Sequence, residues 1–102
     1  QEKVYVVFVD SKNRPLGHEC FSEGGFDFSI IDLRVLFKSI LNRNATGFFL
    51  LHNHPSGDST PSQNDIEVTG EIYEIAQRMK LRFLDHIVVG EHYFSFADNG
   101  LM

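Results

Sequence analysis

The sequence predicts a single α/β (α+β) domain in which helices flank a mixed β-sheet. Its 102 residues fit one domain. Hydrophobic residues make up 42% of the chain and include ten phenylalanines, which is enough for a core. Strand-like apolar runs and one-sided helical patterns follow one another in the order β-β-α-β-α-β-β. This order indicates a mixed sheet, without repeats or low-complexity segments.

A hairpin opens the predicted sheet. Residues 2–10 form a β-branched and aromatic run, which is typical of a central strand. Residues 11–15 contain Asn13 and Pro15 and predict a turn. Residues 16–22 then read as the returning strand, and the segment 23–25, with two glycines, ends it.

The first helix is predicted from residue spacing. Residues 29–32 form a plausible helix start, and large apolar side chains then recur at positions i, i+3, i+4, i+7 and i+8. These are Leu33, Leu36, Phe37, Ile40 and Leu41. Arg34, Lys38 and Arg43 lie off this stripe, so we interpret them as a solvated face.

The second half of the chain predicts strand, helix, strand and strand. Residues 47–51 are an apolar run typical of a buried strand. Thr60 and Gln63 match a capping box, with Pro61 at the first helical position. Residues 81–89 and 93–96 read as the last two strands. The predicted core face of the helix consists of Ile66, Ile72, Ile75, Ala76 and Met79.

Polar residues that can bind a metal follow the buried strand. His52 and His54 lie two residues apart at its end, and alternate side chains of a strand face the same way. Asp65 falls in the first turn of the next helix, three residues after Ser62. Two neutral imidazoles and a carboxylate suit zinc, with a fourth position left for water. A His-x-His pair alone is usually coincidental, but the added proline, serine and aspartate favour a metal site.

The same stretch resembles a known family signature. His52-Asn53-His54-Pro55, six residues, Ser62, two residues and Asp65 is similar to the JAMM motif of JAB/MPN-type zinc metalloproteases. The form His-Asn-His-Pro-Ser-Gly, with the later Leu-Asp-His-Ile of residues 84–87, resembles the bacterial RadC branch, described as a DNA repair family. The resemblance implies a JAB/MPN-like (cytidine-deaminase-like) fold, with residues 1–102 forming one RadC-like domain.

Roles for individual residues follow from that resemblance. It implies zinc held by His52, His54 and Asp65, and a hydrogen bond from Ser62 to the oxyanion of a tetrahedral intermediate. It implies a general base at Glu2, because a glutamate precedes the first core strand in JAMM-like enzymes. Spacing alone does not choose Glu2 over Glu19 or Glu23, and Glu19 is the second choice. We expect no other cofactor.

The expected function is zinc-dependent hydrolysis of amide or isopeptide bonds in a protein or peptide. The alternative is a metal-binding interaction module that acts in DNA repair or replication without hydrolysis. A third option, a degenerate structural JAB domain, is disfavoured by the intact motif. The sequence does not identify the substrate or the oligomeric state. The net charge of −5 and pI of about 5.4 give no basis for binding DNA, so DNA is expected only through an upstream domain.

Other features bound the cellular context. The single cysteine, Cys20, excludes an internal disulfide and a cysteine-based zinc cluster, and we expect it to be a small buried hydrophobe. No apolar run approaches the roughly 18 residues of a membrane span, and no signal peptide is visible. A cytoplasmic protein is therefore expected. The chain begins with Gln1 rather than Met, which suggests a C-terminal domain excised from a longer protein.

Three further polar residues lie near the motif or in a strand. We interpret His86 as a hydrogen-bonded core histidine rather than a metal ligand, because it lies inside an apolar strand. Asp85 either orients a ligand imidazole or is a polar group at a strand end. Asp58 lies in a Gly-Asp-Ser setting that is typical of a turn.

Overall fold

Five strands form one sheet in the computed structural model, which describes residues 2–21 and 27–102. The strand order across the sheet is β2-β1-β3-β4-β5. Only β3 and β4 pair in parallel; the other neighbours are antiparallel, so the sheet is mixed as predicted. In chain order the elements are β1 (Val4–Val9), β2 (Pro15–Phe21), η1 (Phe28–Ile30), α1 (Leu33–Asn42), β3 (Gly47–Asn53), α2 (Gln63–Arg78), β4 (Arg82–Val89) and β5 (Tyr93–Ser95).

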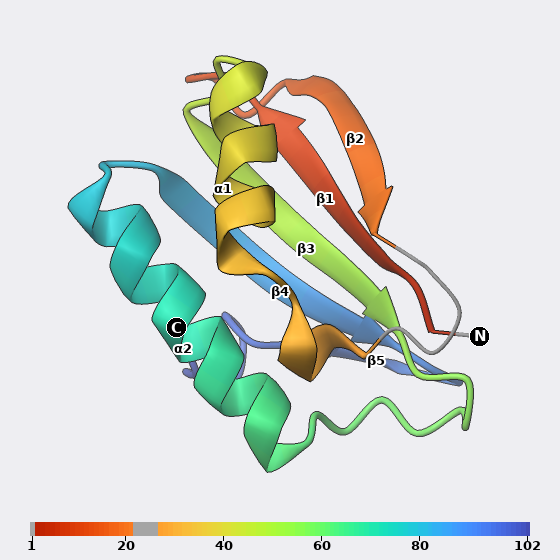
Figure 1. The fold of residues 1–102 in the computed structure, drawn as a ribbon. Helices are drawn as coiled ribbons and strands as arrows, with labels where there is room; N and C mark the ends of the chain where they lie inside the picture. Colours follow the sequence, from red (N-terminus) through yellow and green to blue (C-terminus); the bar gives the residue numbers. More distant parts are fainter. Residues whose placement is uncertain (1, 22–26) are drawn as a thin grey trace.

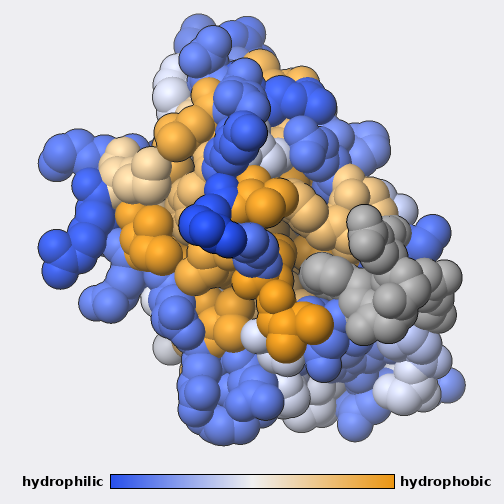
Figure 2. All heavy atoms as spheres, viewed as in Figure 1, coloured by the Kyte–Doolittle hydropathy of each residue, from blue (hydrophilic) through white to orange (hydrophobic). Residues whose placement is uncertain are grey.

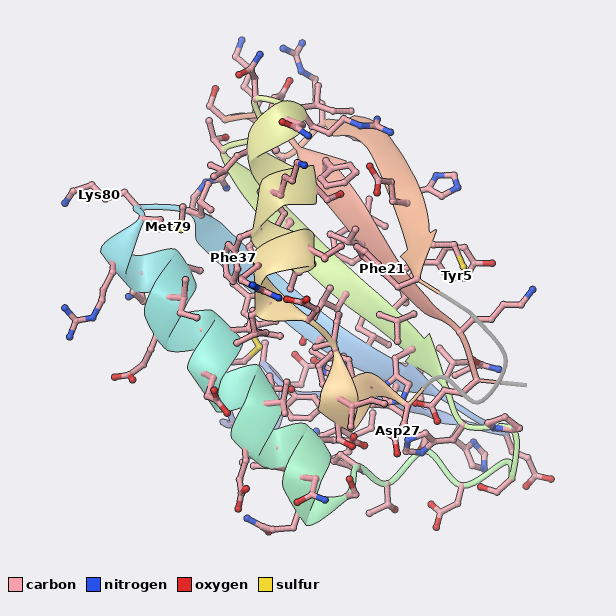
Figure 3. All side chains as sticks on the ribbon, viewed as in Figure 1. Tyr5, Phe21, Asp27, Phe37, Met79 and Lys80 are labelled. Carbon is pink, nitrogen blue, oxygen red and sulfur yellow. The ribbon has the colours of Figure 1, made fainter. Side chains whose placement is uncertain are left out.

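Both helices cover the same face of this sheet (Figure 1). Alternate residues of the central strands point toward the helices and are fully buried, among them Val6, Phe8 and Leu50. The helices contribute a continuous apolar cluster to the same core, formed by Leu36, Phe37, Ile40, Ile72 and Ala76. Phe37 points from α1 into this layer, whereas Lys80, just past the end of α2, extends into solvent (Figure 3). The predicted α+β domain and its order of elements are therefore confirmed.

Apolar side chains also reach the surface in the middle of the helical face, with hydrophilic side chains around them (Figure 2). Ile30 and Val35 are among the large hydrophobic residues that stay exposed. Scattered exposed apolar residues are normal for a small domain. No described helix is long and apolar enough to cross a membrane.

The start of α2 differs from the prediction by two residues. Its N-cap is Ser62 rather than Thr60, and the capping box joins Ser62 to Asp65. Pro61 therefore precedes the cap instead of occupying the first helical position. Asp65 satisfies this role because its carboxylate reaches back to the N-cap backbone N–H, as a glutamate or glutamine does in the commoner form of the box.

Three predicted core residues lie at the surface. Leu41 is 50% exposed and Met79 is 41% exposed, because each lies at the C-terminal end of its helix and beside, rather than on, the buried stripe. Cys20 is exposed on β2, an edge strand that the helices do not cover. Strand β2 ends at Phe21, so the predicted break at residues 23–25 lies outside the described residues.

Candidate metal centre

The end of β3, the start of α2 and the residues before β1 lie toward the same end of the sheet (Figure 1). Backbone pairing explains why. Val4 pairs with His52, and the Asn53 N–H donates to the Lys3 carbonyl (3.2 Å). The Lys3 N–H in turn donates to the Asn53 side chain. Glu2 is thereby fixed beside His52, although the two are fifty residues apart in the chain.

The three predicted ligands converge at this point. His52, His54 and Asp65 each offer one ligand atom, and these atoms all lie within 4.8 Å of one another. His54 Nε2 lies 3.5 Å from Asp65 Oδ2, and the two imidazole centroids are 4.7 Å apart. His52 is the penultimate residue of β3, whereas His54 follows the strand. The strand end and the helix start therefore bring together a group of side chains that could hold a metal ion.

The helix cap positions Asp65. Its Oδ2 accepts a hydrogen bond from the Ser62 N–H (3.1 Å), and its own N–H donates to Ser62 Oγ (3.0 Å). Asp65 is 3% exposed, so its carboxylate is held in place rather than free in solvent. The side chain that caps α2 is thus the same one that faces His54.

The orientation of His54 fixes its tautomer. His54 Nδ1 lies 2.8 Å from the Asp58 carbonyl oxygen. A carbonyl only accepts, so Nδ1 must carry the proton, and neutral His54 presents a bare Nε2 toward Asp65. The Asp58 side chain accepts from the Thr60 N–H (3.0 Å), a bond that lowers the pKa of this exposed carboxyl. This is turn chemistry, as predicted for Asp58, but its backbone carbonyl also orients a site residue.

His52 has a buried nitrogen that lacks a hydrogen-bond partner. Its Nε2 lies 2.8 Å from Glu2 Oε1, but the two groups are not aligned for a hydrogen bond. Burial lowers the pKa of His52 and so favours the neutral ring. The negative charges of Glu2 and Asp65 act in the opposite direction but do not cancel this effect. A buried, unpartnered imidazole nitrogen beside two carboxylates and a second imidazole fits the ligand set of zinc.

Glu2 lies in the site, whereas Glu19 does not contact it in the described structure. The Glu2 side chain is 21% exposed, and its Oε1 also accepts a hydrogen bond from the Phe28 N–H (3.0 Å). Glu19 lies on edge strand β2 opposite Val6, two positions from the residue that pairs with His52. Glu23 lies outside the described residues. The catalytic roles assigned to Glu2 and Ser62 stay predictions.

His86 lies behind the site. It is fully buried, stacks on Phe96 (4.6 Å between centroids) and contacts the Phe28 ring. Burial lowers its pKa to about 3, and His52 and His54 add to the shift. His86 bonds to Thr69 (2.8 Å) and to His52 (3.2 Å). The interpretation of His86 as a hydrogen-bonded core histidine is confirmed.

Asp85 does not orient an imidazole. Its carboxylate accepts from the backbone N–H groups of His86 and Ala97 and from the Ser95 hydroxyl (2.6 Å). These bonds hold the turn after β5 against β4. The alternative prediction, a polar group at a strand end, is right about the absence of an orienting role but wrong about the place, because Asp85 lies inside β4.

Thr69 is the site residue that sequence reasoning missed. It lies one helical turn after Asp65 on α2, is fully buried and contacts His86. The available signal was its i+4 spacing from Asp65 on the helix face that continues into Ile72 and Ala76. A threonine on that face could have been read as a polar extension of the metal site.

A hollow of about 360 Å³ adjoins the same strand end. Most of its lining comes from the sheet face opposite the helices, and His52 connects it to the metal site. The lining residues are Lys3, Tyr5, Leu51, His52, Asn53 and Val89.

The fold and site define a class: a small α+β domain that carries a two-histidine, one-aspartate metal-binding group at the end of a central strand. Comparison with known sequences gives the family. The sequence model described as "RadC-like JAB domain" matches residues 1–101, and the chain belongs to this family. The fold is consistent with a JAB/MPN-like architecture.

Several curated relatives are all named UPF0758 protein. The one from Syntrophotalea carbinolica is 39% identical over 103 residues, which cover 100% of this chain and 45% of the relative. That from Symbiobacterium thermophilum is 39% identical, covering 99% of this chain and 44% of the relative. That from Flavobacterium johnsoniae is 38% identical, covering 98% and 44%. The chain thus spans less than half the length of these relatives.

Proposed function

We propose that this domain is a zinc-dependent metallohydrolase that cleaves amide or isopeptide bonds in a protein or peptide. One observation carries the proposal: His52, His54 and Asp65 converge within 4.8 Å, with the Glu2 carboxylate 2.8 Å from His52 Nε2. Two imidazoles and one carboxylate match the ligand set of catalytic zinc sites, which keep a position open. Membership of the JAB family supports the same chemistry.

His52, His54 and Asp65 would hold the ion. Bound zinc would polarise the scissile carbonyl and lower the pKa of water to about 7. Glu2 would accept the proton of the attacking water and return it to the leaving amine, since a positioned carboxylate can perform both transfers. Its partial exposure lets water reach it, and the Phe28 N–H holds it in place.

Ser62 would stabilise the oxyanion. Its Oγ already accepts a hydrogen bond from the Asp65 N–H. That bond uses a lone pair of the oxygen, so the hydroxyl proton stays available to a second acceptor. Helix capping and oxyanion stabilisation are therefore compatible in one side chain. The mostly apolar hollow beside His52 offers a place for the flanking peptide chain.

A metal-dependent interaction module without hydrolysis is the rival function. It predicts the same metal but no role for Glu2 beyond structure. The experiment that tests the proposal therefore has two parts, metal content and dependence of activity on the carboxylate.

Elemental analysis of protein purified without added metal should give about one zinc per chain. His52→Ala combined with His54→Ala should remove it, while His18→Ala, which changes an exposed histidine on β2, should not.

Glu2→Gln should retain zinc and lose roughly 10²-fold or more of the rate on a peptide and isopeptide library, the usual scale for a general base. Glu19→Gln is the matched control. Zinc that survives the double substitution would disprove the metal site. Zinc bound without hydrolysis of any library member would favour the rival.

A further inference from the structure

Thr69 and His86 join two of the proposed metal ligands through a chain of hydrogen bonds. Thr69 Oγ1 lies 2.7 Å from the Asp65 carbonyl oxygen and 2.8 Å from His86 Nδ1. His86 Nε2 lies 3.2 Å from His52 Nδ1. All four residues are at least 97% buried, so water does not supply alternative partners.

The direction of each bond follows from the carbonyl at one end. The Asp65 carbonyl can only accept, so the Thr69 hydroxyl donates its single proton there. Thr69 Oγ1 must then accept from His86, which places the His86 proton on Nδ1. The reverse assignment would put two oxygens 2.7 Å apart with no proton between them.

The assignment of donors and acceptors extends to His52 in the same way. A neutral His86 that is protonated on Nδ1 has a bare Nε2, which needs a donor. His52 Nδ1–H is the donor at 3.2 Å. His52 therefore carries its proton on Nδ1, and its Nε2 is bare, as it must be to bind a metal. Glu2 Oε1 lies 2.8 Å from this nitrogen but is not aligned to accept a hydrogen bond from it, so the contact does not place the proton on Nε2.

We infer that Thr69 and His86 are positioning residues that hold His52 in the Nε2-bare tautomer required of a metal ligand. The chain of bonds begins at the backbone of one ligand, Asp65, and ends on the ring of another, His52. This chain of bonds fixes the proton of His52 on Nδ1, as the Asp58 carbonyl does for His54 through one direct contact. This inference rests on the metal-binding part of the proposed function and not on hydrolysis.

Aromatic residues pack around the hydrogen-bonded chain of Asp65, Thr69, His86 and His52, which we call the relay, and keep it rigid. Phe28 stacks on the His52 ring (5.2 Å between centroids) and Phe96 lies parallel to the His86 ring (4.6 Å, 5° between planes). Neither ring can flip without displacing a buried neighbour. The tautomer is thus selected by hydrogen bonds, and the ring orientation by packing.

Two substitutions at one position test the relay. Thr69→Val keeps the branched shape and removes the hydroxyl, so His86 loses its acceptor and His52 its fixed tautomer. Zinc affinity, measured by competition with a chromophoric chelator, should fall about 10–100-fold, the usual effect of removing a group that orients a ligand. Thr69→Ser keeps the hydroxyl and should stay near wild type. Ser39→Ala removes another buried hydroxyl, one without a hydrogen-bond partner, and should change nothing.

A second readout needs no metal. Long-range ¹H–¹⁵N correlation spectra of metal-free wild-type protein separate protonated from bare imidazole nitrogens. We expect His52 and His86 both to carry the proton on Nδ1. In Thr69→Val, a change in the tautomer of His52 or His86 should appear.

A proton on Nε2 of His52 in the wild type would overturn the inference even if zinc binds, and so would a Thr69→Val protein with wild-type affinity. Failure of the wild type to bind zinc would instead disprove the proposed function, while the spectra still decide the relay. If Thr69→Val does not fold, the wild-type spectra alone decide it.

Discussion

Where β3 begins, the sheet face under the helices is aromatic: Phe48 stacks on Phe83 (4.8 Å, 8° between planes) and meets Phe37 edge-on. Where β3 ends, the same face carries the buried rings of His52 and His86. The strand rings at both ends, Phe48 and Phe83 at one and His52 and His86 at the other, are buried, and they are only a few residues apart on the same strands. The comparison separates what builds the fold from what builds the site.

Helix α2 shows the same contrast along its length. Its buried stripe begins with Asp65 and Thr69 and continues with Ile72 and Ala76. Ile72 and Ala76 stabilise the fold by removing apolar surface from water, an effect that does not depend on the direction of any contact. The first pair must find a hydrogen-bond partner for every buried polar atom, because each unmet group costs about 1–3 kcal/mol.

The polar end meets this requirement almost completely. Thr69, His86 and Asp65 all have partners. Among the described residues, only two buried side-chain polar atoms have no hydrogen-bond partner, His52 Nε2 and Ser39 Oγ. The first points toward carboxylates and another imidazole; the second does not. The unmet nitrogen of His52 belongs to a group that could hold a metal ion and supports the proposed site, whereas Ser39 belongs to no such group among the described residues.

Phe48→Ala should give the largest effect on stability, at the aromatic end. Phe48 is fully buried and touches two other rings, so the substitution leaves a cavity and should lower the free energy of unfolding by about 3–5 kcal/mol. Urea unfolding monitored by circular dichroism measures it. Phe49→Ala, on the other face of the same strand, should cost less because Phe49 is only partly buried. Zinc bound per folded chain should stay unchanged in both; loss of zinc in Phe48→Ala would show that the two ends are not separable.

Acid should destabilise the polar end of the metal-free protein. The pKa of buried His86 is about 3, below the ordinary value of 6.5, and that of His52 is lowered as well. Between pH 6.5 and 3 the unfolded chain therefore binds more protons. The stabilisation from neutral His86 is complete above pH 6.5 and is lost as the pH falls toward 3, by up to about 1.4 kcal/mol per pH unit. The lowered pKa of His52 acts in the same direction.

Urea unfolding at pH 7, 6 and 5 with chelator present measures this slope. His86→Gln removes one of the two groups and should flatten the dependence. His18→Ala, which changes an exposed histidine on β2, is the matched control. An unchanged slope in His86→Gln would mean that His86 is not the buried neutral base described above.

Gly90→Ala should weaken metal binding although Gly90 is not one of the proposed metal ligands. A Cβ at Gly90 would lie 2.3 Å from the Gly57 carbonyl oxygen and 3.0 Å from the Ser59 N, both backbone atoms that cannot swing aside. The loop between them carries Asp58, whose carbonyl orients His54. We expect a loss of about 1–3 kcal/mol in stability and a weaker zinc affinity.

Gly70→Ala is the control for the Gly90 substitution. Gly70 lies on α2, and no described atom outside the neighbouring helix backbone comes within 4 Å of its Cβ position, so alanine there should stabilise the helix by about 0.5–1 kcal/mol. Both effects are measured by thermal unfolding and zinc titration. Equal zinc affinity in the two variants would show that the 57–59 loop does not position His54.

The strands and helices were predictable because their signals are local. The β-branched run of β1, the apolar run of β3 and the spacing of Leu36, Phe37 and Ile40 each lie in one segment. The errors occurred where the outcome depends on tertiary position. Whether Leu41 is buried depends on where α1 leaves the sheet, and spacing alone carries no information about that.

The metal-binding group was only partly predictable from local signals. Strand alternation relates His52 to His54, and one helical turn relates Ser62 to Asp65. The convergence of Asp65 with the two histidines was predicted from the whole motif and its resemblance to the JAMM signature. The relay was not. It depends on the pairing of β3 with β4, which brings His86 behind His52, and on the tilt of α2, which directs Thr69 at His86. A strand pairing between segments more than thirty residues apart has no local signature. The N-cap was missed because two candidates separated by one residue, Thr60 and Ser62, both had a polar partner three residues later.

Ser39→Ala should give the smallest effect and completes the comparison. Ser39 is a buried hydroxyl on α1, 7% exposed, and its Oγ has no hydrogen-bond partner in the described structure. Removing it takes away a desolvated polar group and loses no bond, while alanine favours the helix. The free energy of unfolding should therefore change by less than about 0.5 kcal/mol or rise slightly. Thr69→Val removes a hydroxyl that is also buried, on α2, and should destabilise by about 1–3 kcal/mol, because it leaves His86 Nδ1 without an acceptor. Chemical unfolding of the two variants side by side measures the difference. If both cost the same, burial alone would set the energy of a hydroxyl in this core, and the distinction between its polar and aromatic ends would have no energetic basis.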